Sequence, residues 1–195
     1  MSREGGLRVL GILGSPRPGG NSELLLDRVL AGAESAEALA EKVSLRDLRI
    51  EPCYECRGCR EGAECVRKDD MQLLHPKLAS APRLVIATPI FFMGVPAMAK
   101  MMIDRAQPFW VGKYVLRKPL PPLPEGRKGF LLAVAARRSD RVFEAARLEV
   151  KAFFHVLDMD YGGELLIPGL EDKGAVNFHP TALADAFAFG KKIAE

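Results

Sequence analysis

The sequence predicts an α/β fold, a three-layer sandwich in which a five-stranded parallel sheet carries helices on both faces. Two observations lead to this prediction. Short apolar runs rich in Val, Ile and Leu alternate five times with helix-like patterns along the 195 residues. Such continuous apolar runs are typical of strands that are buried on both faces, and their alternation with helices favours a parallel sheet. We therefore expect a single domain over residues 1–195, with its ligands at the carboxyl ends of the strands.

The first three elements follow from their apolar spacing. Residues 7–14, LRVLGILG, form a continuous apolar run and predict the first strand. Residues 21–40 predict a helix, because apolar side chains recur on one face and Asn21 or Ser22 can serve as its N-cap. Residues 43–48, VSLRDL, alternate apolar and polar side chains and predict the second strand.

The middle of the chain begins with a cysteine-rich loop over residues 50–68. A helix is expected from Asp69 towards Ala81, and Pro76 should kink or shorten it because proline removes a helical hydrogen bond. Residues 83–90, RLVIATPI, predict the third strand.

The second half continues the alternation. A helix over 96–106 begins at a proline, which is favourable in a first turn. Residues 108–128 are expected to form a long proline-rich loop. The prolines in question are Pro108, Pro119, Pro121, Pro122 and Pro124. The remaining predicted elements are a strand over 129–136, a helix over 139–158, a strand over 161–168 and a closing helix over 180–194.

Composition and charge narrow the function classes. The net charge is +3 and the sequence pI is about 8.7, which is too weakly basic to indicate nucleic-acid binding. The first residues, MSREGGLRVLGILG, do not match a signal peptide. No apolar run approaches the roughly 18 residues that a membrane span needs. We therefore expect a cytoplasmic protein with no nucleic-acid partner and no membrane association.

The segment between the first strand and first helix, GSPRPGGNS (14–22), has the composition of an anion site. A helix N-terminus offers unpaired N–H groups and a positive dipole end, which bind phosphate. Ser15, Asn21 and Ser22 add side-chain donors, and Arg17 adds a charged one. The segment matches neither the P-loop nor the dinucleotide fingerprint. The alternative is a plain strand-to-helix turn with an Asn or Ser cap.

All four cysteines of the chain lie close together. They are Cys53, Cys56, Cys59 and Cys65, with the spacing C-x2-C-x2-C-x5-C. Four thiolates can ligate a [4Fe–4S] cluster, one per iron, and Arg57, Arg60, Arg67 and Lys68 would offset its negative charge. Three alternatives stay open: a structural zinc site, a redox disulfide within a CxxC pair, and an ancestral motif that no longer holds metal.

Together these segments resemble a known family. GSPRPGGNS resembles the phosphate loop of the flavodoxin-like NAD(P)H-dependent FMN reductases. TPIFFMGVPAMAKMMIDR (88–105) is similar to the second flavin segment of that family. The cysteine segment, which runs into DDM, resembles the corresponding block of the iron–sulfur flavoprotein branch. The resemblance therefore implies a flavodoxin-like three-layer fold.

The resemblance also implies the residues that bind FMN. Ser15, Arg17, Asn21 and Ser22 would hold the phosphate. The isoalloxazine ring would be lined by Thr88, Pro89, Ile90, Phe91, Phe92 and Gly94. The sequence departs from the family at two places. Phe91 stands where many members have Tyr, and residues 135–138 (AARR) stand where many have a glycine-rich loop.

The resemblance implies an electron-transfer iron–sulfur flavoprotein. Such a protein is an FMN-dependent oxidoreductase that passes electrons between FMN and a [4Fe–4S] cluster. The cluster ligands would be Cys53, Cys56, Cys59 and Cys65. No side chain is expected to act as acid or base, because the flavin carries the chemistry. The donor would be NAD(P)H or a ferredoxin-like carrier. The family resemblance implies a homo-oligomer, a homodimer or homotetramer. Two alternatives are a cluster-free NAD(P)H-dependent FMN or quinone reductase and a flavodoxin-type electron carrier.

Residues on the helix after the second flavin segment have a simpler expected role. We expect Lys100, Asp104 and Arg105 to form a solvated helix face, with anchoring of the flavin loop or of a dimer partner as the alternative. Trp110 and Tyr114 are expected to lie at a subunit interface or over the flavin.

Overall fold

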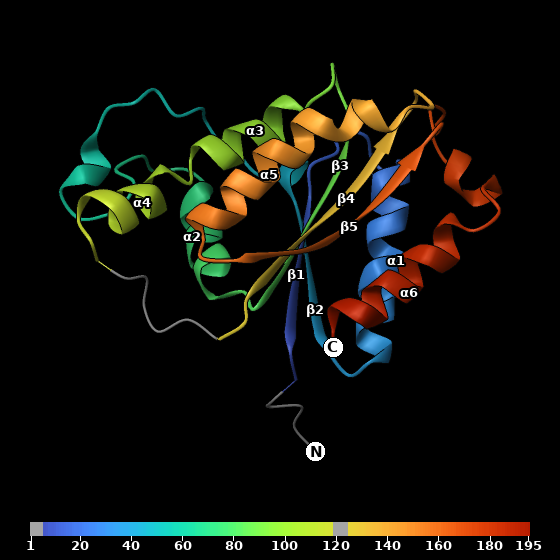
Figure 1. Cartoon of the computed structure of the whole chain (residues 1–195). Helices are drawn as coiled ribbons and strands as arrows, with labels where there is room; N and C mark the ends of the chain where they lie inside the picture. Colours follow the sequence, from blue (N-terminus) through green and yellow to red (C-terminus); the bar gives the residue numbers. More distant parts are fainter. Residues whose placement is uncertain (1–5, 119–124) are drawn as a thin grey trace.

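The five strands form one parallel sheet in the order β2-β1-β3-β4-β5. The computed structural model describes residues 6–118 and 125–195 (Figure 1). The strands are β1 (Arg8–Leu13), β2 (Leu39–Ser44), β3 (Arg83–Pro89), β4 (Lys128–Ala135) and β5 (Asp160–Pro168). Because all neighbours run parallel, the five carboxyl ends meet at one edge of the sheet. The predicted five-stranded parallel α/β sheet is confirmed.

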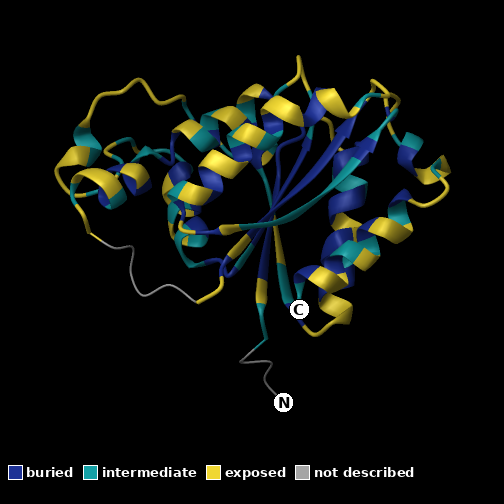
Figure 2. Ribbon diagram, in the orientation of Figure 1, coloured by how far each residue is buried: buried dark blue, intermediate teal, exposed yellow. Residues whose placement is uncertain are grey.

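Helices cover both faces of this sheet, as predicted. One face carries α1 (Asn21–Ser35) and α6 (Ala182–Ile193). The other carries α2 (Met71–Ser80), α3 (Ala97–Asp104) and α5 (Glu144–Val156), and a separate apolar core lies under each set. The central strands β1, β3 and β4 are almost wholly buried, as Figure 2 shows. This burial explains why their sequences are continuous apolar runs.

The second strand was predicted in the wrong place. Residues 43–48 were expected, but β2 runs from Leu39 to Ser44, and residues 45–47 form a 3₁₀ turn. The preceding helix was expected to reach residue 40 and ends at Ser35, where the chain reverses through Glu37 with φ 65°. The cause is that β2 is an edge strand with charged residues at its exposed middle, so it lacks the apolar run of a buried strand.

The helix after the cysteine segment runs on past its proline. A helix from Asp69 towards Ala81 was expected, with Pro76 kinking or shortening it. The helix α2 runs from Met71 to Ser80 with Pro76 inside, so it is not shortened. A proline within a helix costs about 3 kcal/mol. Burying Met71, Leu74 and Leu78 on the same helix contributes about 1.5–3 kcal/mol each, which offsets that cost. Tertiary packing thus overrides the local preference.

The segment expected to be a loop over 108–128 begins as helix. Pro108 lies in the first turn of α4 (Gln107–Trp110), where its missing N–H has no helical partner to lose. A π-helical segment, Val111–Val115, continues it, and β4 begins at Lys128. Pro119, Pro121, Pro122 and Pro124 lie outside the described residues. The prediction was therefore wrong for the first part of this segment.

The remaining elements follow the predicted pattern with small shifts. A 3₁₀ turn over Asp140–Phe143 precedes α5, and α6 occupies most of the expected closing helix. Within residues 6–118 and 125–195, no helix combines the length and the hydropathy that a membrane span requires.

Candidate functional site

A cavity of about 360 Å³ opens at the carboxyl ends of β1, β3, β4 and β5. We refer to it as the strand-end cavity. Its walls come from the segments that follow these four strands. The lining residues are Ser15, Pro16, Arg17, Gly20, Asn21, Ser22, Pro89, Ile90, Phe91, Val134, Ala136, Leu170 and Glu171. Its size and position are those of a small-molecule site in a parallel α/β sheet.

One end of the strand-end cavity is built as an anion site. Gly20 is the N-cap of α1, and no side chain caps this helix. The first N–H groups of a helix lack helical partners, so those of Asn21 and Ser22 can point to a ligand. Ser15 is 3% exposed, and its hydroxyl accepts a hydrogen bond from the N–H of Arg17 at 3.2 Å. The Arg17 side chain itself is exposed at the rim.

Seven of the ten residues predicted to contact FMN line this cavity. They are Ser15, Arg17, Asn21, Ser22, Pro89, Ile90 and Phe91. The other three, Thr88, Phe92 and Gly94, do not line it. Thr88 is fully buried, and its hydroxyl donates to the carbonyl of Pro89 at 2.9 Å. The residues predicted from this linear motif therefore divide into those that line the cavity and those that lie behind or beside its wall.

Phe92 and Gly94 belong to a tight hairpin beside the cavity. The backbones of Phe91 and Gly94 exchange two hydrogen bonds, of 2.9 and 3.0 Å. Phe92 and Met93 between them have φ angles of 48° and 70°, the left-handed region that favours glycine. Phe92 projects fully into solvent. Its ring therefore lies at the tip of the hairpin, away from the cavity wall.

The side chain of Asn21 fixes another wall of the cavity. Its amide nitrogen donates to the carbonyl of Asp172 at 2.9 Å, and its oxygen accepts from the N–H of Val176 at 3.2 Å. These bonds hold the segment after β5, which supplies Leu170 and Glu171 to the lining. These two residues were not predicted as site residues, because nothing in their local sequence marks a site. Their position after a strand is the signal that could identify them.

A charge network stabilises the loop that precedes α1. The Glu23 carboxylate accepts two hydrogen bonds from Arg46, at 2.9 and 3.0 Å, and one from the N–H of Gly19 at 2.8 Å. Lys42 adds an ion pair at 3.3 Å. The Arg46 hydrogen bond is the largest cause that lowers the pKa of Glu23, to about 2. The network joins the phosphate-loop segment to the edge strand β2.

Removing this charge should change how stability depends on pH. The folded pKa of Glu23 is depressed, so its contribution is present above about 4.5 and is lost as the pH falls towards about 2. We expect Glu23→Gln to lower the unfolding free energy at pH 7 by about 2 kcal/mol, allowing for the partial exposure of its partners. Between pH 4.5 and 2, the difference from the wild type should shrink.

Urea titrations at a series of pH values measure this effect. Asp27→Asn is the matched control, since Asp27 pairs with the same Lys42 but its side chain is 47% exposed. Its cost should stay below about 0.5 kcal/mol. A constant difference between Glu23→Gln and the wild type from pH 7 to pH 2 would show that the network does not act through this carboxylate.

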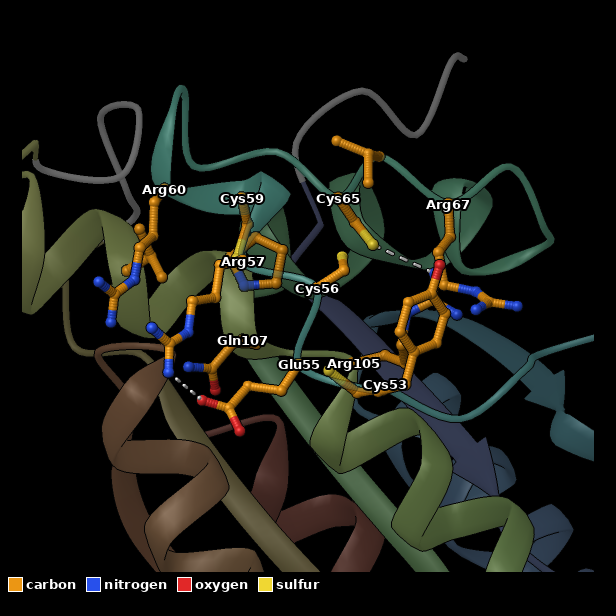
Figure 3. A pocket seen from close by; sticks show the side chains of 14 residues that line it. Cys53, Glu55, Cys56, Arg57, Cys59, Arg60, Cys65, Arg67, Arg105 and Gln107 are labelled. Carbon is orange, nitrogen blue, oxygen red and sulfur yellow. Dashed lines mark hydrogen bonds and ion pairs between the residues drawn. The ribbon is translucent and has the colours of Figure 1, made fainter.

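The four cysteines line a second cavity at the far end of α3, which we call the cysteine cavity (Figure 3). They lie in the segment between β2 and α2, whose only regular structure after residue 50 is a 3₁₀ turn, Gly58–Arg60. Four arginines lie at the same cavity: Arg57, Arg60, Arg67 and Arg105. Cations beside the thiols would offset the negative charge of a thiolate-bound group.

The four thiols do not converge on one point. Among the described residues, which include all four cysteines, no three His, Cys, Asp or Glu side chains are placed to hold a single metal ion. All four thiols are free. Burial raises the pKa of the Cys59 thiol, and the charges of Cys65, Cys53 and Cys56 also raise it. The thiols thus face one cavity closely enough to affect one another.

Arg105 is buried, which corrects the prediction of a solvated face. It directly follows α3, is 1% exposed, and pairs with Asp69 through both guanidinium nitrogens, at 2.5 and 3.0 Å. Lys100 and Asp104 do lie on the exposed side and pair with each other at 2.6 Å. The helical spacing separates Lys100 and Asp104 from Arg105, but nothing in the local sequence indicates the carboxylate of Asp69 that pairs with Arg105.

Comparisons with known proteins identify related sequences. The family model described as NADPH-dependent FMN reductase matches residues 7–161. An iron–sulfur flavoprotein from Methanocaldococcus jannaschii is 36% identical over 106 residues, which are 54% of this chain and 55% of that protein. One from Archaeoglobus fulgidus is 35% identical over 103 residues, 53% of this chain and 47% of that protein. The matches thus span about half the length of these relatives.

A solved structure agrees on the fold over nearly the whole chain. An NAD(P)H:quinone oxidoreductase from Methanothermobacter marburgensis superimposes with a TM-score of 0.72 at 18% identity. The match covers 97% of both chains. At this identity the likeness concerns the fold alone, whereas the family model covers most of the sequence. The chain therefore belongs to the NADPH-dependent FMN reductase family.

Proposed function

We propose that this protein is an FMN-dependent oxidoreductase that transfers electrons between FMN in the strand-end cavity and a [4Fe–4S] cluster in the cysteine cavity. The observation that carries the proposal is that all four thiols line one cavity with four arginines around it. When bound by these residues, FMN would supply hydride and single-electron chemistry, and a cluster on the four cysteines would supply single-electron chemistry. Relatives named iron–sulfur flavoproteins support this reading.

The residues of the strand-end cavity fit FMN. We assign the phosphate to the N–H groups at the start of α1, with Ser15, Arg17 and Ser22 around them. Asn21 contributes its backbone N–H, while its side chain holds the segment after β5. Pro89, Ile90 and Phe91 form the wall for the ring, and Thr88 supports it from behind. Gly94 closes the hairpin beside the wall, and Phe92 lies exposed at the hairpin tip.

The residues of the cysteine cavity match the ligand set of a cluster. A [4Fe–4S] cluster takes one thiolate at each iron. The four cysteines that line this one cavity would supply these ligands. Arg57, Arg60, Arg67 and Arg105 would offset the negative charge of the thiolate-bound group.

A second candidate is a cluster-free NAD(P)H-dependent FMN or quinone reductase. It is supported by the strand-end cavity, whose lining contains no cysteine and which is complete without the cysteine segment. The two candidates share the flavin site and differ in the cysteine cavity. Iron content separates them.

The partners follow from the same reading. The electron donor would be NAD(P)H or a ferredoxin-like carrier in the cytoplasm. A homodimer or homotetramer is supported by exposed aromatic side chains at Phe92, Trp110 and Tyr114, which are exposed by 106%, 38% and 44%. Subunit contacts of this kind are enriched in aromatic residues.

The FMN assignment is tested by a double variant, Ser15→Ala with Arg17→Ala. Hydrogen bonds to a charged group contribute about 1.5–3 kcal/mol each, so FMN affinity should fall at least about tenfold. Arg49→Ala is the matched control, because the Arg49 side chain is 85% exposed and lies outside the strand-end cavity. Fluorescence titration of apoprotein with FMN measures both. Wild-type affinity in the double variant would overturn the phosphate assignment.

A further inference from the structure

The guanidinium of Arg105 directly contacts one of the four cysteines. Its Nη2 donates to the Sγ of Cys65 at 3.3 Å and to the Asp69 carboxylate at 3.0 Å. Its Nη1 donates to the carbonyl of Glu51 at 2.7 Å and to Asp69 at 2.5 Å. Arg105 reaches these partners from the end of α3, beneath the cysteine cavity (Figure 3). A hydrogen bond thus connects the buried Arg105 to the Cys65 thiol of the cysteine cavity.

The same residues close the base of the cysteine segment. The Asp69 carboxylate also accepts from the N–H of Glu51 at 3.0 Å and from the N–H of Met71 at 3.1 Å. Glu51 and Asp69 lie on either side of the four cysteines along the chain. Arg105 holds both flanks, which places Cys65 over its Nη2. The position of Cys65 is therefore determined by a buried ion pair rather than by the exposed loop alone.

Burial makes the charge of Arg105 effective. Arg105 is 1% exposed, and its Nε is buried without a hydrogen-bond partner among the described residues. A cation in such a site is weakly screened and acts strongly on a neighbouring sulfur. The other three arginines of the cavity differ, since Arg57 and Arg60 are exposed and the Arg67 side chain is 19% exposed. Among the described residues, Arg105 is the arginine with a hydrogen bond to a cysteine sulfur.

We propose that Arg105 is the positioning residue for Cys65 as a cluster ligand and that its hydrogen bond raises the reduction potential of the cluster. This inference rests on the proposed function. A positive donor to a ligand sulfur stabilises the reduced, more negative state of a cluster. The bond also holds the Cys65 sulfur towards the cavity, so the fourth ligand is oriented before a cluster assembles.

Two variants and a control test this role. Arg105→Lys keeps the charge but loses the forked donor that reaches Asp69 and Cys65 together. Arg105→Gln removes the charge as well. Lys100→Gln removes an exposed cation from the same helix, where Lys100 pairs only with Asp104 among the described residues. The readouts are iron per FMN and the midpoint potential of the cluster. The potential is measured by EPR-monitored redox titration of anaerobically purified protein.

We expect the cluster of Arg105→Gln to have a more negative midpoint potential. At a fixed ambient potential, the ratio of reduced to oxidised cluster should fall about tenfold. For a one-electron couple this corresponds to a midpoint potential about 59 mV more negative. The Arg105→Lys cluster should shift less, and Lys100→Gln should leave the potential unchanged. An unchanged potential in both Arg105 variants, with wild-type iron content, would overturn this inference alone.

Two other outcomes are also decisive. If the Arg105 variants lose iron, Asp70→Asn is compared, because the Asp70 carboxylate accepts from the N–H of Arg49 at 2.7 Å and closes the same segment without a hydrogen bond to Arg105 among the described residues. Retained iron in Asp70→Asn would support the positioning of Cys65 by Arg105, whereas equal loss would overturn it in favour of loop closure. Wild-type protein without iron would overturn both the inference and the cluster function, although FMN binding would stand.

Discussion

Replacing Arg127 with methionine is expected to lower the free energy of unfolding by about 3–5 kcal/mol. Arg127 is 3% exposed and donates to three carbonyls. The acceptors are Ala81 O at 2.9 Å, Leu157 O at 2.5 Å and Leu78 O at 2.6 Å. These carbonyls lie at the ends of α2 and α5, where helical partners run out. Methionine fills similar space but leaves all three carbonyls without a donor, and each costs about 1–3 kcal/mol.

Arg83 provides the matched control for this prediction. It pairs with Lys128, the residue next to Arg127, in the register of β3 and β4. Arg83 also donates to backbone carbonyls, including Gly126 O at 2.9 Å and Ile193 O at 3.1 Å. Its site is partly exposed, so water can replace the lost donors, and Arg83→Met should cost about 1 kcal/mol. Equal losses for the two variants in urea unfolding would show that burial is not what makes Arg127 important.

Gly190→Ala is expected to destabilise the protein by about 2–3 kcal/mol, although alanine is ordinarily the better helix former by about 1 kcal/mol. The helices α1 and α6 cross at two glycines. A Cβ on Gly190 would lie 1.9 Å from the carbonyl oxygen of Val29, and one on Gly32 would lie 2.1 Å from that of Phe187. Backbone atoms cannot move aside as a side chain would, so the helices must separate and expose the core beneath them.

Gly62→Ala is the control for the effect of alanine itself, because a Cβ at Gly62 meets no atom within 4 Å. Its free energy of unfolding should stay within about 0.5 kcal/mol of the wild type. Thermal and urea unfolding of the two variants make the comparison. A Gly190→Ala protein as stable as the wild type would contradict the close crossing of α1 and α6.

The fold was predictable from the sequence because its central strands are buried on both faces. Residues 83–90 and 129–136 contain almost no polar side chains, and they became β3 and β4 with shifts of about one residue at their ends. The edge strand β2 escaped prediction for the opposite reason. Its neighbours are solvent and one strand, so its sequence carries charge where a central strand would carry Val or Ile.

Two prolines show how tertiary context decides the effect of a residue: the loop predicted at Pro108 begins as helix, and Pro76 does not shorten α2. Pro108 was read as the start of a loop, yet the first turn of a helix accepts proline without losing a bond. Pro76 lies inside α2, where buried neighbours on both sides hold the helix. In both cases the local rule was valid, but the position of the residue within the element determined its effect.

The site was predictable to the extent that it is contiguous in sequence. The segment 14–22 and the residues after β3 form two walls of the strand-end cavity, as expected. Leu170 and Glu171 come from the segment after β5, which Asn21 holds over a sequence separation of 151 residues. The role of Arg105 likewise depends on Asp69, which is distant in sequence and carries the carboxylate that buries it. Contacts of this kind cannot be read from spacing.

The measurement that tests the account most directly is the quantitation of iron, acid-labile sulfide and FMN in one anaerobically purified sample. The account predicts about four irons and four sulfides per FMN in the wild type. Cys56→Ser, prepared in parallel, should keep its FMN and lose iron, because Cys56 lines the cysteine cavity and not the strand-end cavity. One FMN per wild-type polypeptide, with neither iron nor sulfide, would contradict the cluster function and indicate a flavin reductase without a cluster.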